Sequence, residues 1–354
     1  MDPNANKRHL LNKLNKKEAL KRLEKENLKR RTVSFYKYVP LHNLTELRDK
    51  LFFDWQKMSV LGRIYLANEG INAQLSIPEK NWEHFVFQLY KIDEFKNIPF
   101  KKAVEDKAKS FFKLTIKIKK QIVSDGLSKD EYDVTNVGTH LSAVEWNEAM
   151  NSGAIVVDMR NHYESEIGHF EGAICPQVES FRDELPIVKS TLKGKEDSKV
   201  LLYCTGGIRC EKASAYLKHH GFNDVSQLHG GIIDYMRQIQ ENPQLSNKFK
   251  GKNFVFDERL SERISDDVIS NCHQCGVSAD THVNCQNVNC NLLFIQCESC
   301  QEKNFKCCSP ECIEVYNLPE KKQKNIRKGV VNKKRFHSHR KVDLSKSFNN
   351  KDNL

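Results

Sequence analysis

Cys204 opens a loop, residues 204–209 with the sequence Cys-Thr-Gly-Gly-Ile-Arg, whose residue types suit a reactive thiolate. Gly206 and Gly207 allow the backbone to curl with its N–H groups turned inward, which makes a nest for an anion. Arg209 adds a full positive charge, which favours the thiolate over the thiol. Such a sulfur attacks electrophiles and can hold a terminal sulfur atom or a covalent adduct. We therefore expect Cys204 and Arg209 to be catalytic and the residues between them to form the nest, namely Thr205, Gly206, Gly207 and Ile208.

Cys210 lies directly after this loop, where the sequence predicts the start of a helix. A cysteine in this position fits two roles. In one it is a resolving thiol that forms a disulfide with Cys204. In the other it is a small side chain packed at the helix start.

The elements on either side place the loop at the edge of a sheet. An apolar strand is predicted at residues 200–203 and a helix at 211–220, and a further apolar strand is predicted at 154–158. Apolar strands separated by helices indicate a parallel sheet covered on both faces. Sheets of this kind bind ligands outside the carboxyl ends of their strands, which is where Cys204 lies. We assign this α/β domain to residues 140–245.

A different pattern precedes it, over residues 32–123. Alternating apolar and polar residues predict strands, and amphipathic stretches predict helices. The predicted strands are 33–39, 62–67, 71–77 and 111–118, and the predicted helices are 44–53 and 79–90. The order β-α-β-β-α-β fits an α+β sandwich of the ferredoxin-like kind.

Nine of the twelve cysteines lie between residues 272 and 312, in closely spaced pairs. In a chain with no export signal, this clustering indicates metal binding rather than disulfides. Two cysteines separated by two residues present two thiolates to one tetrahedral ion. Interleaving the pairs gives two sites, one of Cys272, Cys275, Cys297 and Cys300 and the other of Cys285, Cys290, Cys308 and Cys312.

We expect two structural zinc ions in this Cys-rich module, residues 250–318, because four protein ligands leave no position for water. An iron–sulfur cluster is the rival, and such a cluster can transfer electrons. Short cysteine pairs favour zinc. On spacing alone Cys307 is interchangeable with Cys308, and His273 and His282 are alternative ligands.

The net charge of +11 is concentrated at the two ends of the chain. Residues 7–31 hold eleven Lys or Arg against three Glu, and residues 320–354 hold twelve against three acids. A basic arm (1–31) and a basic, disordered tail (319–354) fit contact with a polyanion, or serve solubility alone. No apolar run approaches the roughly 18 residues that span a bilayer, and no signal peptide is evident. We expect a cytoplasmic protein without membrane contact.

Residues 203–213, around Cys204, resemble the signature of the rhodanese-domain tRNA uridine hydroxylases, which act at the wobble position. The blocks that extend the resemblance are 68–72, 158–161, 163–164, 168–173, 227–231 and 254–259. The family has an acylphosphatase-like domain, then a rhodanese domain, then a Cys-rich tail. The resemblance therefore implies that the ferredoxin-like domain is acylphosphatase-like and that Cys204 is the rhodanese cysteine.

The resemblance also implies an activity, the hydroxylation of uridine(34) at C5 to give 5-hydroxyuridine. Its partner would be tRNA, bound through the anticodon loop, and its co-substrate molecular oxygen. No flavin or dinucleotide fingerprint identifies a redox cofactor. Cys204 would add to C6 of the base, hold a persulfide that reacts with oxygen, or have only an activation role.

Two other functions are compatible with parts of the sequence. The Cys-x4-Arg loop has the length typical of sulfur transfer, whereas the related phosphatases use a loop one residue longer. A persulfide sulfurtransferase acting in tRNA thiolation, fed by thiosulfate or a protein persulfide, is therefore the alternative. A non-catalytic RNA-binding module is disfavoured by the intact cysteine loop.

Overall fold

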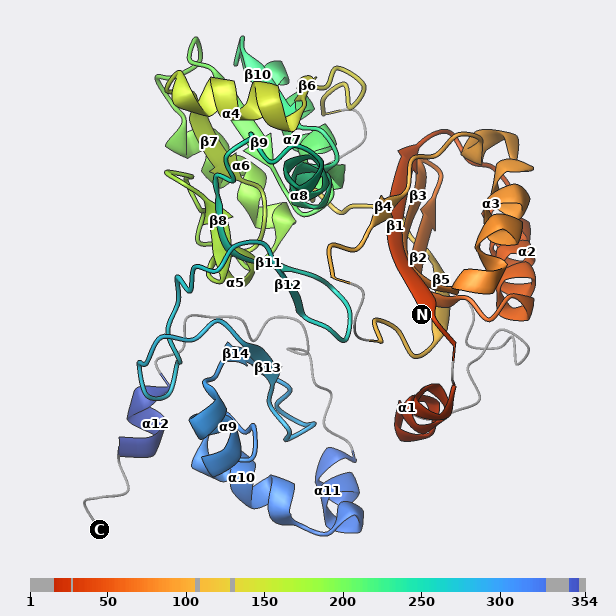
Figure 1. Cartoon of the computed structure of the whole chain (residues 1–354), viewed down its shortest axis with the longest axis vertical. Coiled ribbons are helices and arrows are strands. Elements are labelled where there is room, and N and C mark those ends of the chain that lie inside the picture. The colour runs from red at the N-terminus through yellow and green to blue at the C-terminus, as the bar shows by residue number, and fades with distance from the viewer. Residues whose placement is uncertain (1–15, 27, 106–108, 128–130, 329–343, 350–354) are drawn as a thin grey trace.

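The computed structural model describes residues 16–26, 28–105, 109–127, 131–328 and 344–349 of the chain. They form an N-terminal domain, a second domain that carries Cys204, and a C-terminal module with the cysteine pairs (Figure 1). Among the described helices, none is both long enough and apolar enough to cross a membrane.

The N-terminal domain is a five-stranded sheet covered by helices on one face. The strands are β1 (Arg30–Tyr38), β2 (Leu61–Ala67), β3 (Gly70–Pro78), β4 (Lys101–Lys102) and β5 (Leu114–Ile118). Their order is β4-β1-β3-β2-β5; β2 and β5 pair in parallel, and the other neighbours pair antiparallel. Helices α2 (Leu44–Lys57) and α3 (Trp82–Tyr90) bury Trp55 and Phe85 in a core shared with Phe35 of β1.

The strand predicted at 111–118 is β5, which begins at Leu114 and lies at the edge of the sheet beside β2. The opposite edge, beside β1, is taken by the two-residue β4, which was not predicted. A strand of two residues shows no alternation of apolar and polar side chains, so the sequence pattern could not reveal β4.

The face of this sheet away from α2 and α3 is polar and turned toward the second domain (Figure 1). Along a strand, successive side chains point to opposite faces, so the residues between the buried ones meet here. They include Tyr36 of β1, Arg63 and Tyr65 of β2, and Gln74 of β3, with Lys101 at the edge. This open face forms one wall of the site described below.

The second domain is a parallel sheet covered on both faces, as expected. Its strand order is β6-β10-β9-β7, and the strands are β6 (Thr139–Leu141), β7 (Ile155–Asp158), β9 (Val200–Tyr203) and β10 (Val225–Leu228). Helices α6 (Phe181–Thr191) and α7 (Ile208–His219) pack on one face, around Leu202. Helices α4 (Ala143–Asn151) and α8 (Gly231–Glu241) pack on the other, around Leu201.

The C-terminal module is joined to the second domain by a small sheet. Strand β11 (Phe249–Phe254) pairs with β8 (Gly168–Phe170) on one side and with β12 (Ser261–Arg263) on the other. The module continues with the hairpin of β13 (His282–Asn284) and β14 (Leu293–Ile295), then α9 (Glu298–Lys303) and α10 (Pro310–Asn317). Leu293 and Ile295 share a core with Tyr163 of the short helix α5 (His162–Ser165). The module is therefore packed on the second domain.

Part of the expected basic arm is structured. Helix α1 (Lys16–Lys25) buries Ala19 and Leu23. Arg30 and Arg31 belong to β1 and pair with carboxylates, Arg30 with Glu26 at 3.1 Å and Arg31 with Glu79 at 2.9 Å. Residues 1–15 of the arm lie outside the described part of the chain.

The tail, expected to be disordered, contains two helices, α11 (Glu320–Arg327) and α12 (Ser345–Asn349). Leu344, next to α12, is buried among the side chains of the second cysteine cluster, which explains why this segment is held in place. Residues 329–343 and 350–354, with many of the tail's basic side chains, lie outside the described residues.

Candidate active site

Cys204 follows strand β9, and the next residues curl around its sulfur atom. Gly207 has a φ of 93°, in the left-handed region, and its N–H donates a hydrogen bond to the Cys204 Sγ at 3.1 Å. A Cβ at this position would lie 2.9 Å from the Tyr36 hydroxyl, so conformation and space both call for glycine. Helix α7 begins at the next residue, Ile208, and brings its positive end to the loop.

The environment of Cys204 favours the thiolate. Burial by itself would raise the pKa of this thiol, because water stabilises the charged form. A hydrogen bond from the Cys210 thiol, the charge of Arg209 and the backbone N–H groups of Arg209 and Gly206 outweigh burial and lower the pKa of Cys204 to about 5. Burial and the adjacent Cys204 raise the pKa of the Cys210 thiol well above its usual range. Cys210 therefore stays protonated and donates to the thiolate.

Arg209 acts on Cys204 through its charge and its backbone N–H. Its guanidinium donates to both carboxylate oxygens of Glu164, at 2.7 and 2.9 Å, and both side chains are almost fully buried. A second carboxyl group, that of Glu184, is fully buried nearby, and burial raises its pKa well above the usual range. Within the described part of the chain, neither carboxyl oxygen of Glu184 has a hydrogen-bond partner.

The N-terminal domain is fastened to the helix that follows the loop. The Tyr36 hydroxyl donates to Glu211 at 2.9 Å, and the Tyr38 hydroxyl donates to the carbonyl oxygen of Ile208 at 3.3 Å. A buried cation one turn later adds to these contacts. Lys212 lies 3.2 Å from Glu69, in the turn between β2 and β3, and 3.1 Å from Asp125, in the linker between the two domains.

A cavity of ≈ 440 Å³ opens at Cys204 between the two domains, a volume within the roughly 300–1,000 Å³ of small-molecule sites. Cys204, Thr205 and Gly206 line one side, and the open face of the N-terminal sheet lines the other. Lys101 extends over the loop from β4. Its Nζ lies 4.4 Å from the centroid of the Tyr36 ring.

Both positive and negative groups line this cavity. Burial lowers the pKa of Lys101, and the neighbouring Asp234, Cys204 and Glu211 oppose that effect. In the wall contributed by the segment after β11, Arg259 pairs with both Asp257 and Glu262, each at 2.6 Å, so its charge is compensated there. A Lys101 cation beside a Cys204 thiolate makes the cavity suited to a polar, anionic or easily polarised ligand.

Asp158 and Arg160 belong to the structure that supports the site. Arg160 binds Asp158 through two nitrogens, at 2.8 and 2.6 Å, and donates to the carbonyl oxygen of Gly168 at 2.6 Å. The Tyr203 hydroxyl donates to the same aspartate at 2.7 Å. Neither Asp158 nor Arg160 is among the residues that line the cavity.

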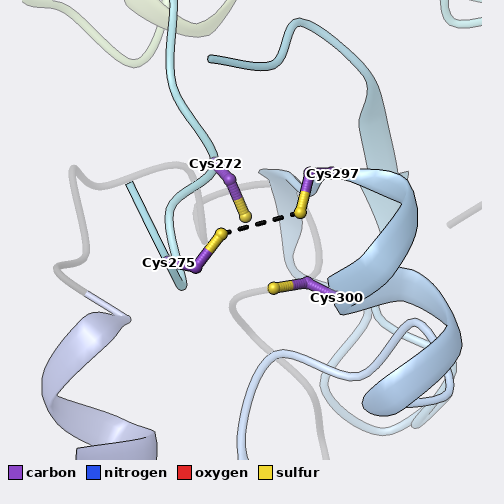
Figure 2. Close-up of side chains that lie close together, drawn as sticks. All are labelled: Cys272, Cys275, Cys297 and Cys300. Carbon is purple, nitrogen blue, oxygen red and sulfur yellow. Dashed lines mark hydrogen bonds between the residues drawn. The ribbon is translucent and has the colours of Figure 1, made fainter. Parts of the chain in front are cut away.

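The structure brings together the first set of four cysteines that the sequence paired. Cys272 and Cys275 face Cys297 and Cys300, which lie at the start of α9 (Figure 2). Their sulfur atoms all lie within 4.8 Å of one another, and the Cys275 and Cys297 sulfurs are 3.6 Å apart. Four sulfurs at about 2.3 Å from one tetrahedral ion would be about 3.8 Å apart, so this set fits a zinc-sized ion.

The second set is gathered in the same way. The sulfurs of Cys285, Cys290, Cys308 and Cys312 lie within 4.8 Å of one another. Cys308 is 3.5 Å from Cys290 and 3.7 Å from Cys312, sulfur to sulfur. Cys307 is not in the group; its thiol points to the carbonyl oxygen of Cys312 at 3.6 Å.

The alternative histidine ligands are not in either group. His273 contacts Glu166 of the second domain at 2.9 Å, and His282 packs edge-on against Phe254.

Sequence reasoning did not identify several residues that the fold brings to the site. Glu164 appeared only as part of a family block, and Tyr36 and Lys101 carried no motif. All three meet the Cys204 loop through contacts between residues far apart in the chain. A signal existed for Glu164, because a buried arginine needs a carboxylate partner, but the sequence does not say which one.

Three family models match the chain, in the order that the sequence predicted. The UPF0176 acylphosphatase like domain matches residues 30–122, the Rhodanese-like domain matches 142–238, and the Rhodanase C-terminal model matches 250–313. The expected order of an acylphosphatase-like domain, a rhodanese domain and a Cys-rich module is confirmed.

Relatives match nearly the whole chain. A tRNA uridine(34) hydroxylase from Leptospira interrogans is 59% identical over 337 residues, which are 95% of this chain and 92% of the relative. A tRNA uridine(34) hydroxylase from Photorhabdus laumondii is 47% identical over 325 residues, 91% of this chain and 92% of the relative. Among solved structures, a rhodanese-like domain from Anabaena is 19% identical, with a TM-score of 0.26, and covers 32% of this chain and 80% of its own.

Proposed function

This chain belongs to the tRNA uridine(34) hydroxylase family, and we propose on that premise that it hydroxylates the wobble uridine of tRNA at C5. The observation that carries the proposal is the Cys204 thiolate, which has a pKa lowered to about 5 and opens into an interdomain cavity of ≈ 440 Å³. A cavity of this size accommodates one nucleoside. The target base must leave its stack to enter, which an anticodon loop allows at low cost.

The chemistry that Cys204 supplies is nucleophilic. Its thiolate adds to C6 of the uracil ring, which makes C5 nucleophilic. C5 then attacks the outer oxygen of a peroxide-level oxidant, whose O–O bond breaks and whose other oxygen leaves as hydroxide or water. Making this oxidant from molecular oxygen takes two electrons and two protons from a reductant. Loss of the C5 proton and release of the Cys204 thiolate restore the C5–C6 double bond and leave a C5 hydroxyl group. In a second, alternative route to the same hydroxylation, Cys204 carries a persulfide that reacts with oxygen.

Other residues of the loop have supporting roles. The N–H groups of Gly206, Gly207 and Arg209 and the charge of Arg209 hold the sulfur as an anion before attack and receive it again afterwards. Cys210 donates to that anion, and its position also suits a resolving thiol that would reduce an oxidised Cys204 through a transient disulfide. Lys101 lies where it would neutralise charge that develops on the uracil carbonyl oxygens.

Zinc is the metal that we propose for both cysteine clusters. Each cluster offers four sulfur ligands, and no water-binding position is left, so the ions would stabilise the fold rather than react. Cys308, rather than Cys307, is the proposed ligand of the second ion. The basic ends of the chain would contact the tRNA backbone, and a tRNA-modifying enzyme of this kind would work in the cytoplasm.

A sulfurtransferase acting in tRNA thiolation is the second candidate, because the length of the Cys204–Arg209 loop favours persulfide transfer. The two functions are separated by mass spectrometry of nucleosides from the tRNA of a deletion strain. Loss of 5-hydroxyuridine supports hydroxylation, and loss of a thiolated nucleoside supports sulfur transfer. Complementation with the Cys204→Ser variant should fail to restore the lost nucleoside, while the variant stays folded and binds tRNA. Full restoration would contradict the role of Cys204.

A further inference from the structure

Beside the cavity at Cys204 lies a second, more open hollow, and among the described residues that line it every charged side chain is positive. Lys119 and Lys120 approach it from the end of β5, and Arg182 approaches it from the start of α6. The Tyr65 side chain lines both hollows. We propose that this hollow is a nucleotide subsite, which holds the nucleotide next to the target uridine with its base on Tyr65 and its phosphate among the three cations. The inference rests on the proposed function.

The two hollows are continuous. Tyr65, Ile122 and Ser124 contribute to the lining of both. An RNA strand that inserts one base toward Cys204 would therefore have its next nucleotide at the second hollow. Residues of both domains line this hollow, as they line the cavity. The Arg182 guanidinium of the second domain is held there by a hydrogen bond of 2.9 Å to the hydroxyl of Ser124, in the linker between the domains.

The positive charge of the hollow is not cancelled by nearby carboxylates. In the described part of the chain, no carboxylate lies within ion-pair distance of Lys119, Lys120 or Arg182. Asp125 and Glu69 are turned inward to the buried Lys212, at 3.1 and 3.2 Å. Asp183, next to Arg182 in the chain, accepts a hydrogen bond from the Ser180 hydroxyl at 2.6 Å and does not line the hollow. Three exposed, uncompensated cations around a concave surface attract a phosphate.

An aromatic ring supplies the second half of the subsite. Tyr65 is partly exposed, and the Nζ of Lys119 lies 5.6 Å from the centroid of its ring. The same combination occurs at the Cys204 cavity, where Lys101 lies over Tyr36 at 4.4 Å. Proteins that hold single-stranded nucleic acid combine an aromatic face, on which a base stacks, with cations that follow the backbone. The open face of the sheet thus offers two such places side by side.

The test uses the full chain and a fluorescently labelled heptanucleotide with an anticodon-loop sequence, titrated by anisotropy across a salt series. Tyr65→Ala should weaken binding by about 5- to 150-fold, the range found for loss of one stacked base. Tyr65→Phe, which keeps the ring, should bind like the wild type. The matched comparison is Lys119→Gln/Lys120→Gln against Lys193→Gln/Lys195→Gln, two exposed lysines that line neither hollow.

The first double variant should flatten the slope of log K against log salt by about 1.4, which corresponds to two lost contacts with a single-stranded backbone. The second should leave the slope unchanged. Equal affinity of Tyr65→Ala and wild type, or equal slopes for the two double variants, would overturn the subsite. Activity separates this failure from failure of the proposed function. RNA binding with these effects, but no hydroxylated uridine, would refute the function and leave the subsite standing. Hydroxylation with an unchanged KM in Tyr65→Ala would refute the subsite alone.

Discussion

Arg209 and Glu164 form a bidentate ion pair, with N–O distances of 2.7 and 2.9 Å, in which the Glu164 side chain has an exposed fraction of 0%. On sequence alone, Arg209 is one positive group beside the sulfur of Cys204. In the structure it serves two purposes, since its charge favours the thiolate and its guanidinium neutralises a buried carboxylate. Removing the arginine therefore affects stability as well as reactivity.

Arg209→Ala should destabilise the second domain by about 3–5 kcal/mol, because it leaves the Glu164 carboxylate buried without its partner. Arg209→Met combined with Glu164→Leu should recover much of this loss, since neither charge then remains. The measurement is the midpoint of urea unfolding, followed by far-ultraviolet circular dichroism. If the single variant unfolds at the wild-type midpoint, the ion pair does not stabilise the domain.

Cys204 should react with iodoacetamide at a rate that depends on pH around its lowered pKa. Because the folded-state pKa is about 5, the thiolate should predominate above that value and be lost as the pH falls through it. The rate at the peptide that contains Cys204 should therefore be nearly constant from about pH 6.5 to 8, whereas an ordinary thiol titrates near 8.5. Peptide mass spectrometry after timed alkylation resolves this cysteine from the other eleven. A midpoint near 8.5 would refute thiolate stabilisation.

Substitutions of Cys210 should show whether this residue acts as a hydrogen-bond donor to Cys204 or as a redox-active thiol. Cys210→Ala removes the donor to the thiolate and should move the alkylation midpoint of Cys204 to higher pH. Cys210→Ser keeps a donor of similar size and should leave the midpoint near that of the wild type. If instead both variants keep the midpoint but lose activity under oxidising conditions, and a reductant restores it, Cys210 acts as a resolving thiol and not as a donor.

Much of this architecture could be predicted because it is local. The strand before Cys204, the glycines of its loop and the spacing of the cysteine pairs each leave a short pattern in the sequence. The two sets of four cysteines agree with the interleaving that their spacing suggested. Closely spaced cysteine pairs can be combined into four-ligand sites in only a few ways. Even the choice of Cys308 over Cys307 needed the structure, since neighbouring residues differ in direction rather than in spacing.

The parts that could not be predicted depend on contacts between distant segments. Glu164 meets Arg209 across 45 residues, and Tyr36 meets Glu211 across 175. The strand β4, which carries Lys101 to the cavity, is too short to have a periodicity. The sequence therefore could not predict that the N-terminal domain supplies one wall of the active-site cavity.

Lys212 should fasten the N-terminal domain to helix α7. It is buried between Glu69 and Asp125 and also donates to the carbonyl oxygen of Val123 at 3.0 Å. Lys212→Met should leave two carboxylates without a cation and loosen the contact between the domains. We expect faster hydrogen exchange at residues 120–127 and a raised KM for tRNA.

The control is Lys218→Met on the same helix, because Lys218 donates to a carbonyl oxygen, that of Val137 at 3.0 Å, and pairs with no carboxylate of the described residues. This variant should exchange hydrogen like the wild type at residues 120–127. Equal exchange in Lys212→Met and Lys218→Met would show that the domains are held by their other contacts, such as the hydrogen bond from Tyr36 to Glu211.

The metal content should distinguish the two neighbouring cysteines of the second cluster. The purified chain should contain about two zinc ions, one for each set of four thiolates. Cys308→Ser should reduce this to about one, because the second ion loses one of its four ligands. Cys307→Ser should keep both ions, since that thiol points to a carbonyl oxygen instead of into the cluster.

Elemental analysis by plasma mass spectrometry measures these contents, and removal of the metal tests what the ions do. Structural zinc contributes on the order of 10 kcal/mol to small modules, so a strong chelator should unfold residues 272–312 before the rest of the chain. Loss of this module should also free His273 from Glu166, a contact of 2.9 Å with the second domain. Bound iron with visible absorbance would identify iron–sulfur clusters instead. Two ions in Cys308→Ser together with one in Cys307→Ser would reverse the assignment of the ligand.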